Sequence, residues 1–207
     1  MRRILKKTQL EILDNFKKDF KEKYGVEPRY DDLRKEKKYH DVKVALIEEQ
    51  YGLCCYCMSR IEDYNSHIEH FIPQSLDYTK DLEYTNIMVS CDGYKGNHLN
   101  CGHKKEDYYD ERLISPLEAD CEGNFKYSIK GEITASESNI RGKKTIERLN
   151  LDSYLLNRAR CRAIYMSGLF DDDFDEKKER LIDLYSTPKE DRLNPFCQAI
   201  LYCLKQQ

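Results

Sequence analysis

The sequence predicts an α+β protein in which a small central core of short strands lies between helical N- and C-terminal regions. Apolar residues recur at helical spacing near both ends of the chain, and two short segments in the middle have the composition of strands. Hydrophobic residues make up 40% of the 207 residues, which is enough for a buried core and excludes a largely disordered chain. Four of the nine cysteines lie on either side of the two strand-like segments.

Residues 1–52 are expected to form a helical support. Thr8 and Glu11 have the spacing of a capping box, with Thr8 as the N-cap residue. The helix that follows is expected to end at Gly25, because four apolar residues recur at helical spacing before it: Leu10, Leu13, Phe16 and Phe20. A second helix is expected over residues 41–51 and ends at Gly52.

Residues 53–112 are expected to form the core that carries the chemistry. A short strand is predicted over residues 66–71, where Pro73 prevents its continuation. A second strand is predicted over residues 86–90, and a helix is expected to open between residues 104 and 109.

Residues 113–207 are expected to add a hairpin and further helices to the same compact unit. Alternating residues from 125 to 133 predict a hairpin around Lys130-Gly131. After the hairpin, four helices are predicted over residues 141–149, 154–170, 175–185 and 194–204. Asp152 or Ser153 is expected to cap the second of these helices. The acidic run at residues 171–173 is expected to be a solvated loop rather than a metal site.

Charge and hydropathy limit the possible surroundings of the protein. The chain has no run of about 18 apolar residues, so no membrane span is expected, and its basic opening lacks the apolar core of a signal peptide. A cytoplasmic protein is therefore expected. The net charge of −3 neither indicates nor excludes a nucleic-acid partner, because a protein that binds nucleic acid needs only a local basic surface.

The cysteines around the strands predict a structural zinc site. Cys54 and Cys57 form a C-x-x-C pair, which lets two thiolates reach one ion from a tight turn. Cys91 and Cys101 are the natural second pair, although a core role for Cys91 and a substitute ligand at His98 remain open. The other cysteines are expected to be small buried hydrophobic residues: Cys55, Cys121, Cys161, Cys197 and Cys203.

The segment His67-Ile68-Glu69-His70 carries the residues that suit phosphodiester hydrolysis. Water is a poor nucleophile at neutral pH, and an imidazole with a pKa near 6.5 is suited to deprotonate it, so His70 is the candidate general base. Asn86 is the candidate residue that orients this base through an oxygen atom. His67 alternates with Glu69 on a strand, yet a surface or core role is favoured for it over a place in the site.

The reaction also needs positive charge beside the scissile phosphate. Glu69 and His103 are the candidate ligands of a catalytic divalent cation, Mg²⁺ or another metal. Asn97, His98 and Asn100 remain alternatives to His103 as the last ligand. Lys104 and Lys105 are the candidate contacts to the flanking phosphates of a nucleic acid.

These residues resemble the HNH, or ββα-metal, nucleases, and within them the PtuB-type nucleases. The resemblance covers roughly residues 42–160, and the segments that carry it are 50–57, 68–75, 82–86, 101–105, 113–116, 125–131 and 145–151. It implies a zinc-stabilised ββα-metal core with flanking helices, and a nuclease effector that cleaves DNA in anti-phage defence of the Septu or retron-associated type. It also implies a PtuA-like ATPase as the partner.

Two other readings of the same residues remain open. The chain can be a stand-alone HNH enzyme of the restriction or homing type, with no ATPase partner. It can also be a zinc-stabilised binding module whose nuclease site is silent. The residues leave both DNA and structured RNA possible as the substrate.

Overall fold

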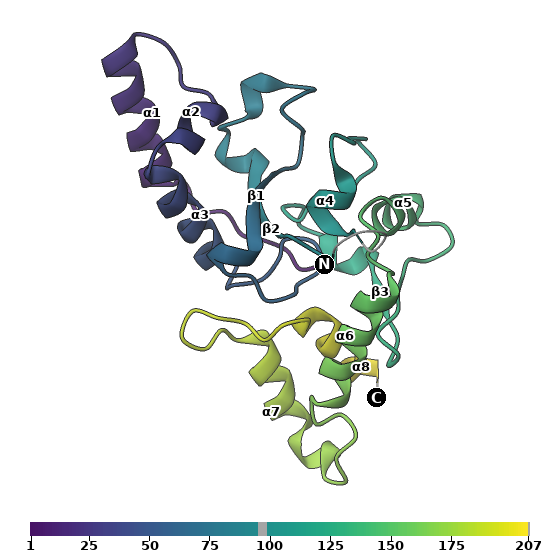
Figure 1. Ribbon diagram of the computed structural model, residues 1–207. Coiled ribbons are helices and arrows are strands. Elements are labelled where there is room, and N and C mark those ends of the chain that lie inside the picture. The colour runs from purple at the N-terminus through teal and green to yellow at the C-terminus, as the bar shows by residue number, and fades with distance from the viewer. Residues whose placement is uncertain (95–98, 207) are drawn as a thin grey trace.

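The centre of the molecule is a pair of antiparallel strands followed by a short helix, as the computed structural model of residues 1–94 and 99–206 shows (Figure 1). Strand β1 (Ser66–His70) pairs with strand β2 (Ile87–Cys91), so that Ser66 lies opposite Cys91. Helix α4 (Cys101–Lys105) packs against β2. The two predicted strands are confirmed to within one residue, whereas α4 begins three residues earlier than expected.

The N-terminal region consists of three helices, α1 (Glu11–Tyr24), α2 (Tyr30–Lys35) and α3 (Lys38–Glu49). The capping box predicted at Thr8 is wrong, because Leu10 is the N-cap residue. Leu10 is buried, and its extended backbone leads the chain into α1 from the core side. The end of α1 at Gly25 is confirmed, where a φ of 73° suits glycine.

Buried polar side chains attach α3 to the central strands. The Gln50 side chain donates to the carbonyl oxygen atoms of Leu53 and Val89 and accepts from the Val89 amide at 2.7 Å. It therefore satisfies the free edge of β2 as a further strand would. Lys43 reaches from α3 to the carbonyl oxygen atoms of Asp63 and Ser66, next to the start of β1.

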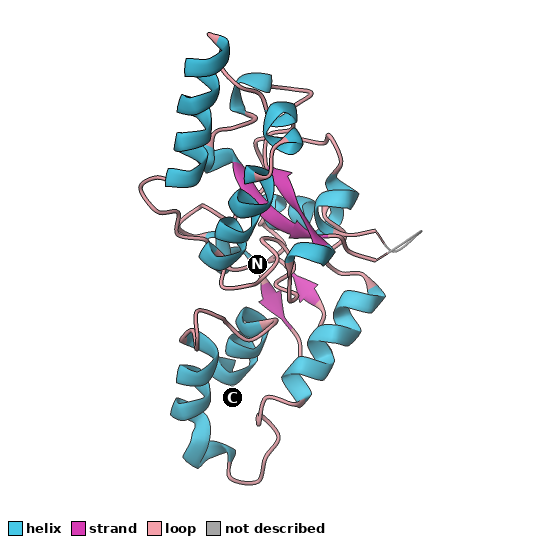
Figure 2. Ribbon diagram, turned by 60° about the vertical axis from the view of Figure 1, so that its left-hand side comes forward, coloured by secondary structure: helices cyan, strands magenta, loops and turns pink. Residues whose placement is uncertain are grey.

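The C-terminal region contains a small hairpin and four helices (Figure 2). The predicted hairpin is confirmed as the antiparallel strands β3 (Lys126–Tyr127) and β4 (Ile133–Thr134). Ser153 rather than Asp152 caps the second helix, where its side chain accepts from the Leu156 amide. The helices are α5 (Ile140–Arg148), α6 (Tyr154–Tyr165), α7 (Phe174–Ser186) and α8 (Cys197–Gln206), so α6 ends five residues earlier than predicted and α8 begins three residues later.

Short 3-10 turns fill several connections between these elements. They cover Asp63–Asn65, Tyr78–Lys80, Tyr84–Asn86 and Cys121–Asn124. The Tyr78–Lys80 and Tyr84–Asn86 turns lie in the connection from β1 to β2, which follows the Glu69-His70 pair. This connection positions the groups around His70, as described below.

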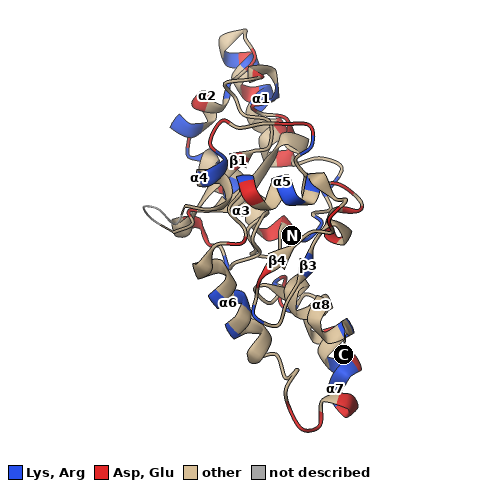
Figure 3. Cartoon of the chain, turned by 90° about the vertical axis from the view of Figure 1, so that its right-hand side faces the viewer, with Lys and Arg blue, Asp and Glu red and all other residues tan. Residues whose placement is uncertain are grey.

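One hydrophobic core includes buried residues from the N-terminal helices, the central strands and the C-terminal helices. Arg160 of α6 lies 1% exposed in it and donates to the carbonyl oxygen atoms of Gly131 and Leu151, which joins the hairpin to α6. Positive and negative side chains are interspersed over the helices (Figure 3). Within residues 1–94 and 99–206, none of the helices is long and apolar enough to cross a membrane.

Candidate functional site

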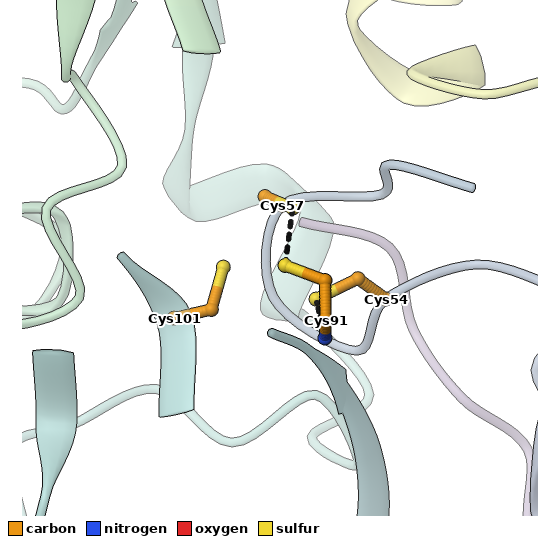
Figure 4. A group of neighbouring side chains, drawn as sticks. All are labelled: Cys54, Cys57, Cys91 and Cys101. Atoms are coloured by element: carbon orange, nitrogen blue, oxygen red, sulfur yellow. Dashed lines mark hydrogen bonds between the residues drawn. The ribbon is translucent and has the colours of Figure 1, made fainter. Parts of the chain in front are cut away.

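The four cysteines predicted as zinc ligands form one cluster (Figure 4). The sulfur atoms of Cys54, Cys57, Cys91 and Cys101 all lie within 4.8 Å of one another, and the four residues are buried. The Cys57 and Cys91 sulfur atoms are 3.7 Å apart. Tetrahedral coordination with a Zn–S distance of about 2.3 Å requires sulfur atoms about 3.8 Å apart. The cluster therefore has the composition and size of a structural zinc site.

Three separate segments supply these sulfur atoms. Cys54 and Cys57 lie in a tight turn that Met58 closes, with a φ of 65° and an amide that donates to the Cys54 carbonyl oxygen. Cys91 is the last residue of β2, and Cys101 is the first residue of α4. A bound ion would thus tie the turn, the strand and the helix together.

Hydrogen-bond donors surround the sulfur atoms. The Cys91 amide lies 3.3 Å from the Cys54 sulfur, and the Asn100 side-chain amide lies 3.0 Å from the Cys101 sulfur. Burial raises the pKa of Cys101 well above its usual range. Burial also opposes ionisation of Cys54, but hydrogen bonds from Cys101 and the other thiols hold the pKa of Cys54 well below its usual range. A dication supplies the charge that would allow all four thiolates to coexist.

The position of Asn100 bears on the alternatives for the last catalytic ligand. Its side-chain nitrogen faces the sulfur atoms of Cys101 and Cys91, and its oxygen accepts from the Tyr94 amide. Asn100 is therefore a hydrogen-bonding neighbour of the cysteine cluster. The other two alternatives, Asn97 and His98, lie outside the described residues.

The remaining five cysteines have the positions expected of small hydrophobic residues. All nine cysteines, which fall within the described ranges, are free thiols. Those outside the cluster are buried or, for Cys161, half-buried: Cys55, Cys121, Cys161, Cys197 and Cys203. Burial raises the pKa of Cys203 to about 11, so its thiol stays protonated at neutral pH.

Glu69 is anchored by two polar contacts on the side of β1 that faces α4. Its Oε1 atom accepts from the Tyr56 hydroxyl at 3.0 Å and lies 3.0 Å from the Lys105 ammonium. Lys105 is only 2% exposed and also donates to the His70 carbonyl oxygen. Lys105 was predicted to contact a phosphate of the nucleic acid, but in the structure it is a buried partner of Glu69. Lys104, the other predicted phosphate contact, is exposed.

Beside Glu69, three further side chains form a second group with metal-ligand chemistry. A nitrogen atom of His67, a carboxylate oxygen of Asp92 and a nitrogen atom of His103 lie within 4.8 Å of one another. The sequence interpretation missed Asp92 and favoured a surface or core role for His67. The available signals were the position of Asp92 directly after Cys91 and the alternation of His67 with Glu69 on β1.

Gly102 allows α4 to approach these side chains closely. A Cβ atom at this position would lie 2.4 Å from Glu69 Oε2 and 2.6 Å from His67 Nε2. Its amide donates to the Ser90 hydroxyl, which fixes the start of α4 against β2. Any larger residue at this position would therefore displace Glu69 and His67.

His70 is the last residue of β1, and its side chain contacts residues of the connection that follows the strand. Its Nε2 atom lies 2.9 Å from the carbonyl oxygen of Asp81, which can only accept, so Nε2 carries the proton and Nδ1 is an acceptor. The Gln74 side-chain nitrogen lies 3.4 Å from Nδ1. Burial lowers the pKa of His70, so the neutral imidazole is favoured at pH 7.

Asn86 has a different contact from the one predicted. Its side-chain oxygen accepts from the Ile72 amide, and its nitrogen donates to the carbonyl oxygen atoms of Ile72 and Lys80. Asn86 therefore ties Ile72 to Lys80 within the connection from β1 to β2. Asp81, whose carbonyl oxygen contacts His70, directly follows Lys80, so Asn86 supports His70 only indirectly, through the backbone of this connection.

Comparison with known proteins yields two relatives and no matching family model. The Septu protein PtuB of Bacillus thuringiensis is 26% identical over 152 residues, which cover 69% of this chain and 51% of that protein. An Escherichia coli protein named "Retron Ec83 putative HNH endonuclease" is 25% identical over an alignment 210 positions long, gaps included, that covers 80% of this chain and 80% of that protein. This chain thus spans about half the length of the PtuB relative. Both identities are low. The two similarities nevertheless make the chain a relative of PtuB and of a retron HNH protein, and they support its resemblance to PtuB-like HNH nucleases.

Proposed function

We propose that this protein is a divalent-metal-dependent HNH endonuclease that cleaves DNA. The observation that carries the proposal is the placement of the Glu69-His70 pair on β1, with Glu69 facing α4. Helix α4 carries His103, two residues after Cys101 of the cysteine cluster. The antiparallel pair β1–β2 followed by α4 has the element order of a ββα-metal core. The name of the retron relative, which contains the words HNH endonuclease, supports the same assignment.

In this proposal His70 is the general base that deprotonates the attacking water. The Asp81 carbonyl oxygen fixes the ring through Nε2, which leaves the Nδ1 lone pair to accept a proton. The Tyr30 ring stands edge-on to the imidazole with centroids 4.5 Å apart, which limits the orientation of His70 further. A base that is neutral and fixed before the reaction loses little entropy when it acts.

The cation site of the proposed enzyme lies on the α4 side of β1. Of the two sequence-predicted ligands, His103 lies in a group of carboxylate and imidazole donors that suits a divalent ion, and Glu69 contacts this group through His67. A bound divalent cation supplies positive charge for the phosphate oxygen atoms and the leaving group. Lys104, exposed on α4, is the proposed contact to a flanking phosphate.

The proposed context is anti-phage defence, with this chain as the nuclease effector and a PtuA-like ATPase as its partner. This part rests on the similarity to the Septu protein PtuB and to a retron-associated protein. Copurification of a large ATPase with the chain would favour this context over a stand-alone enzyme of the restriction or homing type.

The test of the base is the substitution His70→Gln, because a glutamine amide can still donate to the Asp81 carbonyl oxygen but cannot accept a proton. We expect DNA cleavage with Mn²⁺ or Mg²⁺ to fall by about 100-fold or more, the usual contribution of a general base. Zinc content is expected to stay unchanged, because the His70 side chain contacts Asp81, Gln74 and Tyr30 and is not a member of the cysteine cluster.

The matched control is His40→Gln, since His40 is exposed and contacts only a surface carboxylate among the described residues. Unimpaired cleavage by His70→Gln would contradict the assignment of the base. A wild-type protein that binds zinc but cleaves neither DNA nor RNA, even with its partner present, would instead be a silent zinc-stabilised binding module.

A further inference from the structure

We propose that His67, Asp92 and His103 are the ligands of a second metal ion, a transition-metal dication, and that Glu69 positions His67 instead of binding the ion. The inference rests on the proposed function for its catalytic meaning, but the ion site itself can be tested without any cleavage assay. It adds His67 and Asp92 to the expected site and changes the role of Glu69.

The first support is the convergence of the three donors. His67 Nδ1 lies 3.0 Å from Asp92 Oδ1, and His103 Nε2 lies 3.6 Å from the same oxygen. The two imidazole rings are 4.4 Å apart between centroids. Two atoms that are each about 2.1 Å from one ion lie roughly 3.0–3.4 Å from each other at coordination angles of 90° or 109°. The donor atoms are therefore already close to the spacing that one shared ion requires.

The second support is the carboxylate on the far side of the His67 ring. Glu69 Oε2 lies 3.6 Å from His67 Nε2, while His67 Nδ1 faces Asp92. Histidine ligands commonly direct their second ring nitrogen toward a carboxylate, which fixes the tautomer and makes the first nitrogen a better ligand. In His67, the second ring nitrogen is Nε2, which faces Glu69. The first is Nδ1, which would bind the ion beside the carboxylate of Asp92.

The third support is the way in which Glu69 is anchored. Tyr56 and the buried ammonium of Lys105 both contact Oε1, so the carboxylate is held from behind and presents Oε2 to His67. A direct metal ligand would have to compete with the Lys105 ammonium for the same carboxylate charge. A Glu69 that only positions His67 can keep its contact with the Lys105 ammonium.

The donor set also indicates the class of metal ion. Two imidazole nitrogen atoms with one carboxylate suit ions such as Mn²⁺, Co²⁺ and Ni²⁺, whereas Mg²⁺ and Ca²⁺ prefer sites made of oxygen atoms. The side chains of Asp92 and His103 are each 47% exposed, so an ion held there would keep positions for water and for a phosphate oxygen. An open coordination sphere is the mark of a catalytic site.

The experiment is a titration with Mn²⁺ of protein that carries one zinc ion per chain, in the cysteine cluster. The electron paramagnetic resonance signal of free Mn²⁺ reports the bound fraction. Mn²⁺ is the weakest competitor for thiolate ligands, so it will not displace zinc from the cysteine cluster. We expect one Mn²⁺ per chain, and an affinity at least about 10-fold weaker in each of His67→Ala, Asp92→Asn and His103→Ala. The substitution Glu69→Gln should weaken binding as well, while His40→Ala should leave it unchanged.

The outcomes separate this inference from the proposed function. Unchanged Mn²⁺ affinity in His67→Ala and Asp92→Asn would overturn the site, whatever the nuclease activity. Mn²⁺ binding that requires all three ligands would support the site, even if the protein cleaves no DNA, and only the proposed function would then fail. Retention of wild-type Mn²⁺ affinity by His70→Gln, together with lost cleavage, would support both.

Discussion

The cysteine cluster and the group formed by His67, Asp92 and His103 are adjacent, yet they differ in every property that governs metal chemistry. The cluster is buried and offers four sulfur donors that would enclose an ion on all sides. The second group is partly exposed, with side-chain exposures of 25% for His67 and 47% for Asp92, and it offers nitrogen and oxygen donors from one side. Closed sulfur sites stabilise a fold, and open mixed sites leave room for a substrate.

The two groups are connected through the chain. Asp92 directly follows Cys91, and His103 is two residues beyond Cys101. Whatever holds Cys91 and Cys101 together therefore also holds Asp92 near His103. The comparison teaches that the buried site can set the geometry of the open one, so that damage should spread from the first to the second but not in reverse.

The largest effect is expected from Cys54→Ser, which removes one sulfur from the buried cluster. We expect zinc content to fall and the free energy of unfolding to drop by at least about 3 kcal/mol, because the binding free energy of a structural zinc ion, about 10–16 kcal/mol, is largely folding free energy. Zinc analysis and denaturant unfolding measure both effects. Mn²⁺ binding at the second group should be lost with them.

The matched control for this prediction is Cys203→Ser, the same chemical change at a buried cysteine of α8 outside the cluster. It should leave zinc content unchanged and cost only about 1–2 kcal/mol for the buried hydroxyl. Full zinc content in Cys54→Ser would contradict the assignment of the cluster.

A smaller and more selective effect is expected from Gly102→Ala. The new Cβ atom would overlap Glu69 Oε2 and His67 Nε2, which are the tips of side chains and can move aside. We therefore expect the fold and zinc content to survive, while Mn²⁺ affinity falls about 10-fold and cleavage is reduced.

Gly123→Ala is the control for this substitution, because among the described residues an added Cβ there meets nothing within 4 Å. Wild-type Mn²⁺ affinity in Gly102→Ala would show that the close approach of α4 is unimportant for the second group. Loss of zinc in the same variant would contradict the one-way dependence between the two sites.

The sequence predicted the regular elements better than their ends. The strands around residues 66–70 and 87–91 and the hairpin were predictable, because short β-rich segments bounded by turn residues have few alternatives. The capping box at Thr8 was not, because burial of Leu10 determines where α1 begins. Helix α2, only six residues long, was missed because it is too short to show a helical period.

The grouping of the four cysteines was predicted from the C-x-x-C pair and a second pair, although a core role for Cys91 and a substitute ligand at His98 had remained open. The surroundings of Glu69 were less predictable, because they depend on which face of β1 meets α4. The face of β1 that carries His67 and Glu69 meets α4. This packing buries Lys105 against Glu69 and brings Asp92 beside His67. The contact of Lys105 with Glu69 has no signal in the spacing of the residues along the chain. The contact of Asp92 with His67 was indicated only by the position of Asp92 after Cys91 and by the alternation of His67 with Glu69 on β1.

The smallest effect is expected from Asn100→Ala, which removes a neighbour of the buried cluster without removing a ligand. The Asn100 amide donates to the Cys101 sulfur at 3.0 Å, and such outer contacts typically change metal affinity 10- to 100-fold. Zinc should still bind, but a chelator should extract it at a concentration about 10-fold lower than from the wild type. The control is Asn194→Ala, which removes an amide that donates to the Leu184 carbonyl oxygen.

Because Asn100 also accepts from the Tyr94 amide beyond Asp92, Mn²⁺ affinity should weaken in parallel. Unchanged Mn²⁺ affinity alongside weaker zinc binding would show that the two sites are set independently.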